Sequence, residues 1–416
     1  MSGAASQQQS PGTESTDHSG TAAPWWQLGL WWLGSLVVAL LHNGLWATPN
    51  LAFVSLIAQR PGENPFSETI AGDYLLSDLS MTTAARVLGQ ADPHEVARLH
   101  LVVLVLGWAA VTALARLRFG HASARNLTVL LAASPLVTVS MQWLGQPDPV
   151  TGLCGIAMVL VRRRWAVIAL GLLAGLTHPE QALFMAGVAG MVRWALPDSE
   201  GSPGAAAIDV GSAAGGVAIG WGLGQAWFRL NDIEILTPRT DFLDYGLSGF
   251  AEHHTQHLLG LTWTLWGPLW LVIVAVATLW FIGRRGPAQP NRGGRAWLVM
   301  AAMAVAAMVP VAITLDETRV YAVITAPLLA GGAVWIAAMW PGAMLRRASV
   351  GLLVLTAILP GGFATGVTSW RPQLDTADMA AFLVHGTVPE GSGAQQSELT
   401  AWLLSPFDFV IPEPPD

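Results

Sequence analysis

Long apolar runs separated by short polar connections fill the chain from residue 24 to about residue 367. A helix needs about twenty mainly apolar residues to cross a membrane, and most of these runs approach that length. The pattern therefore predicts an all-α fold, a polytopic transmembrane helical bundle of about eleven helices. The runs lie at roughly 24–48, 98–117, 126–144, 150–161, 165–177, 181–194, 205–228, 263–282, 296–314, 320–340 and 349–367.

Three neighbouring runs are shorter than a usual span, at 150–161, 165–177 and 181–194. They could be steep half-spans, or two of them could merge into one. The span count therefore stays open in this part of the chain.

Polar segments flank and interrupt the predicted membrane domain of residues 24–367. Residues 1–23 are rich in Ser, Gln, Gly and Thr and lack Arg, which predicts a disordered cytoplasmic tail and not a signal peptide. A long loop follows the first run at about 49–97, and its "SDLSMTTAARVLG" segment predicts an amphipathic helix capped by Ser77. Residues 368–416 form a second predicted tail, on the outer face.

Charge is scarce: 53% of the residues are hydrophobic and 11% are charged. Soluble domains carry about 25% charged residues, so this chain cannot build a charged shell around a core of its size. All 20 basic residues are Arg, which indicates a GC-rich genome of the actinobacterial kind. The one cysteine, Cys154, excludes an intrachain disulfide, and the net charge of −7 argues against nucleic acid as a partner.

Arginine falls mainly in every second connection, and this predicts the orientation. Thirteen of the 20 Arg lie there, so the positive-inside rule assigns those connections to the cytoplasm, and 22 of the 27 acids then lie outside. We expect a multi-pass protein of a bacterial plasma membrane, with its N-terminus in the cytoplasm and its C-terminus outside. The thirteen are Arg116, Arg118, Arg125, Arg162, Arg163, Arg164, Arg193, Arg284, Arg285, Arg292, Arg295, Arg346 and Arg347.

Ionisable and amide side chains collect at the outer ends of the predicted helices, in four separate connections. Such groups are costly at membrane depth and usually face a cavity. Their convergence predicts a functional site on the outer face. The segments are "AGDYLLSDLS" with Asp73 and Asp78, "WLGQPDPVTG" with Trp143, Gln146 and Asp148, "THPEQ" with His178, Glu180 and Gln181, and "LDETRVYA" with Asp316, Arg319 and Tyr321.

Each of these groups also has a purely structural alternative. Asp148 could cap the following helix, and His178 could satisfy a backbone carbonyl. The acid and amide after Pro179 could be ordinary first-turn residues. Arg319 could pair with Asp316, three residues back.

A histidine-rich segment, "AEHHTQH", lies in the later outer loop. His253 and His257 are four residues apart, a spacing that suits one helix face and a metal. The segment has no HExxH pattern and no evident third ligand, so we expect an interfacial helix and no metal site. The chain also lacks GxxxxGK[ST] and GxSxG, which argues against a nucleotide-driven pump and a simple serine hydrolase.

Three segments resemble the GT-C class of integral-membrane glycosyltransferases, including uncharacterised bacterial members. They are the acidic first loop before "AARVLGQADP", the "QPDPVTGL" turn with "RRRW" and "GLLAGLTHPEQ", and "LDETRVYA". Together they span roughly residues 24–340. The class uses polyprenyl-phosphate sugars on the outer face. In this alignment Asp78 matches the catalytic Asp, although His94 stands where "PY" is usual, and "GDYLLSD" aligns equally on Asp73.

The resemblance implies a sugar transfer to an envelope glycan or lipid acceptor, without a cofactor. A loop carboxylate, Asp78 or Asp73, would take the proton of the acceptor hydroxyl. The leaving lipid phosphate would be held by Arg319, with Arg239 and His178 as further candidates. The sugar or acceptor would contact Asp148, Gln146, Glu180, Gln181, Trp143, Asp316 and Tyr321.

Two other functions stay open. A transporter or flippase for a lipid-linked sugar would need polar residues through the membrane midplane. A non-catalytic protein of envelope assembly would bury Asp78 and Arg319 in structural pairs. All three interpretations share membrane lipid as a partner, and the first adds a polyprenyl-phosphate-linked sugar and a glycan or glycolipid acceptor.

Overall fold

The computed structural model describes residues 23–46, 50–66, 73–196, 202–235, 246–283, 290–340, 342–359, 361–364, 368–369 and 376–386. Apart from one short antiparallel pairing of β1 (Phe363–Ala364) with β2 (Thr368–Ser369), these residues are helical or in connections. The all-α class is therefore confirmed. The segment of residues 1–23, for which the sequence predicts a disordered tail, lies almost wholly outside the described residues.

Helices coincide with the predicted apolar runs along the whole chain. The first is α1 (Trp25–Asn43), and the loop after it contains α2 (Asn50–Gln59), η1 (Asp73–Ser77) and α3 (Leu79–Val87). The later helices are α4 (Pro93–Phe119), α5 (His121–Ala132), α6 (Pro135–Gln142), α7 (Asp148–Leu160), α8 (Arg164–Thr177), α9 (Pro179–Ala195), α10 (Pro203–Leu230), α11 (Gly246–Gln256), α12 (Leu258–Trp266), α13 (Leu269–Gly283), α14 (Pro290–Ala306), α15 (Met308–Val311), α16 (Glu317–Met339), α17 (Gly342–Ile358) and α18 (Thr376–His385).

Length and bending distinguish the apolar helices. Within the described ranges, α4, α10 and α16 are each long and apolar enough to cross a membrane. The pair α5 and α6 is bent by 49°, and the pair α12 and α13 by 79°, so up to five spans result if each pair counts as one. The helices α7 and α8 are shorter. The predicted number of eleven spans stays a prediction.

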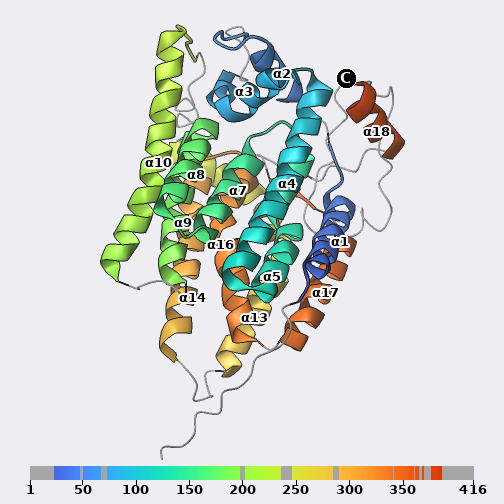
Figure 1. Cartoon of the computed structure of the whole chain (residues 1–416), viewed down its shortest axis with the longest axis vertical. Helices are drawn as coiled ribbons and strands as arrows, with labels where there is room; N and C mark the ends of the chain where they lie inside the picture. Colours follow the sequence, from blue (N-terminus) through green and yellow to red (C-terminus); the bar gives the residue numbers. More distant parts are fainter. Residues whose placement is uncertain are drawn as a thin grey trace, which may run out of the picture.

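The two ends of the bundle have different chemistry. The loop helices α2 and α3 lie at one end with α18 (top of Figure 1), where Leu51, Phe228 and Phe382 belong to one apolar cluster. The helix α4 begins in this cluster and runs to the other end. There Arg118, in its last turn, and Arg193 both donate to the carbonyl of Val161. Arginines from two parts of the chain thus meet at the connection between α7 and α8.

Glycines allow α8 and α10 to pack with their backbones in contact. Gly171 and Gly175 on α8 face Gly216 and Gly220 on α10, and both pairs have small-xxx-small spacing. A Cβ added at Gly220 would lie 2.2 Å from the Leu172 carbonyl oxygen, and one at Gly175 would lie 2.3 Å from that of Val217. Only glycine permits this approach.

Candidate functional site

A buried histidine fixes the turn between α6 and α7, which carries several predicted site residues. The amide of Gly145 donates to Nδ1 of His100 (3.2 Å), and the other ring nitrogen of His100 lies 2.8 Å from the Ser140 carbonyl oxygen. A neutral ring protonated at Nε2 satisfies both contacts. Gly145 has a φ of +93°, which favours glycine. The turn is therefore held in place by a side chain of α4.

The charged centre of the site joins this turn to the start of α16. Nε of Arg319 donates to Oδ2 of Asp148 at 3.0 Å, and its NH1 donates to Oδ2 of Asp316 at 2.9 Å. The guanidinium also lies 4.8 Å from the centre of the Trp143 ring. Arg319 and Asp148 are buried, whereas 37% of the Asp316 side chain is exposed. The local pair with Asp316 is thus present, and Asp148 pairs with Arg319 instead of capping α7.

The chain after α17 returns to cover this centre. The amide of Ala364 in β1 donates to the Thr318 hydroxyl at 2.8 Å, and the Phe363 ring lies 5.4 Å from the Trp143 ring. The Gln142 amide donates to the carbonyl of Gly361 at 3.1 Å. Residues far apart in the sequence therefore enclose the arginine.

Asp78 is the buried acid of the loop, at the start of α3. Its Oδ1 accepts hydrogen bonds from the Ser80 hydroxyl (3.0 Å) and the Met81 amide (3.2 Å), while Oδ2 is buried with no hydrogen-bond partner among the described residues. Asp78, and not Ser77, is thus the helix cap, because Ser77 ends η1. Burial is the main reason that the pKa of Asp78 rises to about 7, and the nearby Asp148 carboxylate adds to the increase.

The first turn of α3 also contacts the junction of α8 and α9. The hydroxyl of Thr177 donates to that of Ser80 at 2.6 Å. The next residue, His178, is buried and lies 3.5 Å from the half-exposed carboxylate of Glu180. Here His178 ends α8 and precedes α9 without forming a side-chain cap. The loop helix α3 and the junction of α8 and α9 therefore meet at the predicted polar residues.

Two buried amides have unused hydrogen-bonding capacity. Both polar atoms of the Gln146 side chain, and Oε1 of Gln181, lack hydrogen-bond partners among the described residues. An unpaired buried amide is costly, and bound water or a polyol hydroxyl would satisfy it.

Of the remaining predicted residues, only Tyr321 has a described side chain, and it contacts another helix. The hydroxyl of Tyr321 donates to the Ala304 carbonyl at 3.3 Å, so it is engaged with α14. Asp73 begins η1, but its side chain is outside the described part of the chain, and Arg239 lies wholly outside it. The roles predicted for Asp73 and Arg239 stay predictions.

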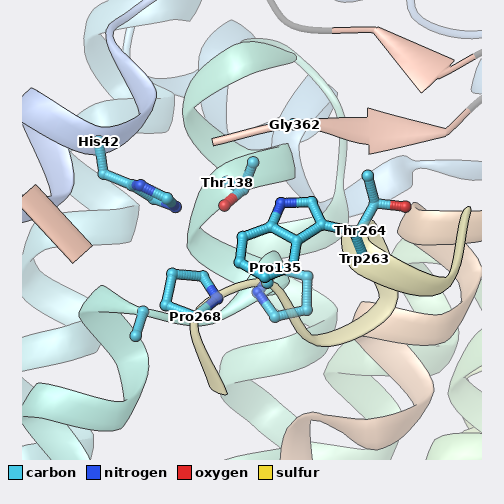
Figure 2. A pocket seen from close by; sticks show the side chains of 9 residues that line it. His42, Pro135, Thr138, Trp263, Thr264, Pro268 and Gly362 are labelled. Carbon is cyan, nitrogen blue, oxygen red and sulfur yellow. The ribbon is translucent and has the colours of Figure 1, made fainter. Parts of the chain in front are cut away.

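Two small pockets lie near the site. One, of about 220 Å³, has His42, Thr138, Trp263 and Thr264 in its wall (Figure 2). The other, of about 360 Å³, lies between α2, α3 and α10, with Leu79 and Thr82 in its wall. Of the residues that the structure describes, neither Asp78 nor Arg319 lines either of these two pockets.

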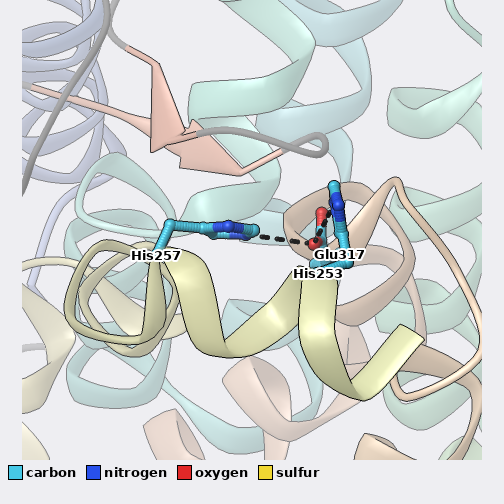
Figure 3. Close-up of side chains that lie close together, drawn as sticks. All are labelled: His253, His257 and Glu317. Carbon is cyan, nitrogen blue, oxygen red and sulfur yellow. Dashed lines mark hydrogen bonds and ion pairs between the residues drawn. The ribbon is translucent and has the colours of Figure 1, made fainter. Parts of the chain in front are cut away.

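Beside the arginine, three histidines surround Glu317, the first residue of α16. Oε1 of Glu317 lies 3.2 Å from Nε2 of His257 and 3.7 Å from Nε2 of His253 (Figure 3). It also lies 3.1 Å from Nδ1 of His254. Burial lowers the pKa of His253, as do the two neighbouring imidazoles, while Glu317 raises it. Sequence reasoning missed Glu317 in this role because it lies sixty residues from His257. Its place beside Arg319 at a helix start was the only available signal.

Comparison with known proteins adds no relative: no family model, curated protein or solved structure matches the chain.

Proposed function

We propose that the chain is a membrane-embedded glycosyltransferase that moves a sugar from a polyprenyl phosphate to an envelope glycan or lipid. The membrane part of the proposal is supported by the long apolar helices and by lipid-compatible exposed side chains such as Trp26, Leu106 and Ile219. In this proposal the eleven apolar runs cross or enter the bilayer, the arginine end faces the cytoplasm, and the end with α2, α3 and α18 faces outward.

The chemistry is supported chiefly by the state of Asp78. It is a buried carboxyl with a pKa of about 7 and an unpaired Oδ2, beside the Asp148–Arg319 pair. A general base works best when its pKa is near the operating pH. A carboxyl whose pKa is shifted by burial and by a neighbouring charged group is typical of functional sites.

The proposed step uses these two groups in different ways. Asp78 removes the proton of an acceptor hydroxyl while that oxygen attacks the anomeric carbon of the donor. The bond between that carbon and the phosphate oxygen breaks, and polyprenyl phosphate leaves with the electron pair. Arg319 stabilises the charge that grows on the phosphate, because a planar guanidinium can bind two oxygens at once. Gln146 and Gln181 would hydrogen-bond sugar hydroxyls.

Asp78→Asn tests the proposal, because it keeps the shape of the side chain and removes its basicity. Purified variants in nanodiscs would receive a panel of radiolabelled polyprenyl-phosphate sugars with membrane extract as acceptor, and decaprenyl phosphate binding would be measured separately. We expect transfer to fall about 10²- to 10⁴-fold with unchanged binding. Asp92→Asn, a change at the cap of α4, is the matched control and keeps full activity.

One observation favours a second candidate, a structural protein of envelope assembly: the two carboxylate partners of Arg319 already occupy it. On that interpretation wild-type protein neither binds decaprenyl phosphate nor transfers sugar from any donor in the panel. Binding that is lost in Arg319→Ala, together with transfer that is lost in Asp78→Asn, would exclude the structural role.

A further inference from the structure

The cluster of Glu317 with His253, His254 and His257 has the contents of a metal site. Its groups come from two elements: α11 with the start of α12, and the first turn of α16. The Glu317 carboxylate is fully buried, and between 7% and 21% of each imidazole is exposed. Figure 3 shows the rings of His253 and His257 approaching the carboxylate from different sides.

Local structure explains why two of the imidazoles converge. His253 and His257 are four residues apart, which places them on one side of a helix. The helix α11 ends at Gln256, and His257 precedes α12 with a φ of −135°. The break lets the two rings lie 5.2 Å apart at 78° to each other. Such an arrangement directs both Nε2 atoms toward one point.

Hydrogen bonding alone does not account for the cluster. A carboxylate oxygen has two lone pairs, and here a single Oε1 is approached by three imidazole nitrogens. The third, Nε2 of His253, is buried at 3.7 Å and has no hydrogen-bond partner within the described chain. In the tautomer that carries its proton on Nδ1, His253 therefore presents an Nε2 lone pair that can bind a metal.

The distances fit a shared cation. Zinc binds nitrogen at about 2.0–2.1 Å and carboxylate oxygen at about 2.0–2.2 Å, so tetrahedral ligands lie roughly 3.3 Å from one another. The ligand atoms of His253, His257 and Glu317 all lie within 4.8 Å of one another, and Nε2 of His257 already lies 3.2 Å from Oε1. A small inward movement of His253 would complete the set.

We propose that His253, His257 and Glu317 bind one divalent zinc ion. Two imidazoles and one carboxylate suit zinc and similar transition metals, whereas magnesium and calcium prefer oxygen ligands. Zinc sites with three protein ligands keep a fourth position for water or another oxygen ligand. His254 is not one of the three metal ligands. Its Nδ1 hydrogen-bonds the Glu317 carboxylate and so orients it, as residues behind metal ligands commonly do.

The ion would connect the outer-loop helix α11 to α16 at a position two residues before Arg319. The site does not depend on the proposed sugar transfer. Zinc can bind whether or not the chain transfers a sugar, so the two proposals fail separately.

The test is zinc titration of full-length protein in detergent, purified without a histidine tag and stripped with a chelator. We expect one zinc ion per chain by calorimetry and by elemental analysis, and a tetrahedral visible spectrum when cobalt replaces zinc. His254→Ala should weaken zinc binding roughly 10- to 100-fold, as loss of a second-shell partner does. His257→Ala and Glu317→Gln, which remove ligands, should weaken it further and abolish the cobalt spectrum.

His94→Ala is the control, because it removes an imidazole near the same end of the bundle and should leave zinc binding unchanged. If Glu317→Gln is poorly folded, His253→Ala replaces it, since this ring is the most exposed of the three. Absence of a stoichiometric zinc ion in the wild type would overturn the proposal, as would equal affinity in His257→Ala and the wild type.

Discussion

Asp148 and Arg319 lie 171 residues apart in the chain and form an ion pair of 3.0 Å, with both side chains almost completely buried. The pair joins the first turn of α7 to the first turn of α16. The second partner of the arginine, Asp316, is one turn away and partly exposed. One guanidinium therefore has two carboxylate partners in very different environments.

This difference predicts unequal costs of substitution. Removing one member of a buried pair leaves a buried charge uncompensated and costs about 3–5 kcal/mol. An exposed pair contributes only about 0.2–1 kcal/mol. We expect Asp148→Ala to lower the melting temperature in detergent strongly and Asp316→Ala to lower it little. Similar losses in the two variants would contradict a buried role for Asp148.

The acidity of Asp78 predicts how stability depends on pH. Its pKa rises from 3.8 to about 7 on folding, so between about pH 4 and pH 7 the folded state binds a proton that the unfolded state lacks. The free energy of unfolding therefore falls as pH rises through this window, by a total on the order of 4 kcal/mol, and it stays constant at higher pH. Melting temperatures across pH 5 to 8 should fall more in the wild type than in Asp78→Asn. Parallel curves would show that folding does not raise the pKa of Asp78.

The α8–α10 contact predicts a sharp contrast between neighbouring glycines. Gly220→Ala would place a methyl group 2.2 Å from the Leu172 carbonyl oxygen, whereas the same change at Gly222 meets nothing within 4 Å. Overpacking typically costs about 1–3 kcal/mol. Thermal unfolding of the two variants should show a clear loss for Gly220→Ala alone. Equal stability would mean that the helices separate readily.

The proposed orientation predicts which sites an impermeant maleimide reaches in intact cells. His385→Cys lies at the end of α18 and Ala343→Cys at the start of α17, and both positions are exposed. In a Cys154→Ser background we expect labelling at position 385 and none at 343 until the cells are broken. The reverse result would place the Asp78 end of the bundle in the cytoplasm.

Hydropathy predicted most of the helices, because an apolar segment can pair all its backbone N–H and C=O groups internally only by forming a helix. The sequence also identified Asp78, Asp148 and Arg319 as individual candidates. It could not pair Asp148 with Arg319, since no local rule links positions 171 residues apart. For the same reason Glu317 was not recognised as the third partner of the histidines. The prediction that Ser77 caps the loop helix was wrong. The helix η1 extends through Ser77, so the side chain of the next residue, Asp78, accepts the hydrogen bond from the first turn of α3.

The length of α7 affects how a substrate can reach the site. This helix has 13 residues, all of them buried, and so rises about 20 Å in a bilayer whose hydrocarbon core is about 30 Å thick. Arg118 donates to the carbonyls of Val159 and Val161 at one end, and such a guanidinium belongs at the cytoplasmic boundary. In the proposed orientation the opposite end, with Asp148, lies roughly 10 Å below the outer boundary. A lipid-linked anion is already held at the membrane and can approach the site sideways between helices, whereas a free sugar phosphate has to enter from water. If the chain transfers sugars as proposed, the recessed position therefore favours lipid-linked donors.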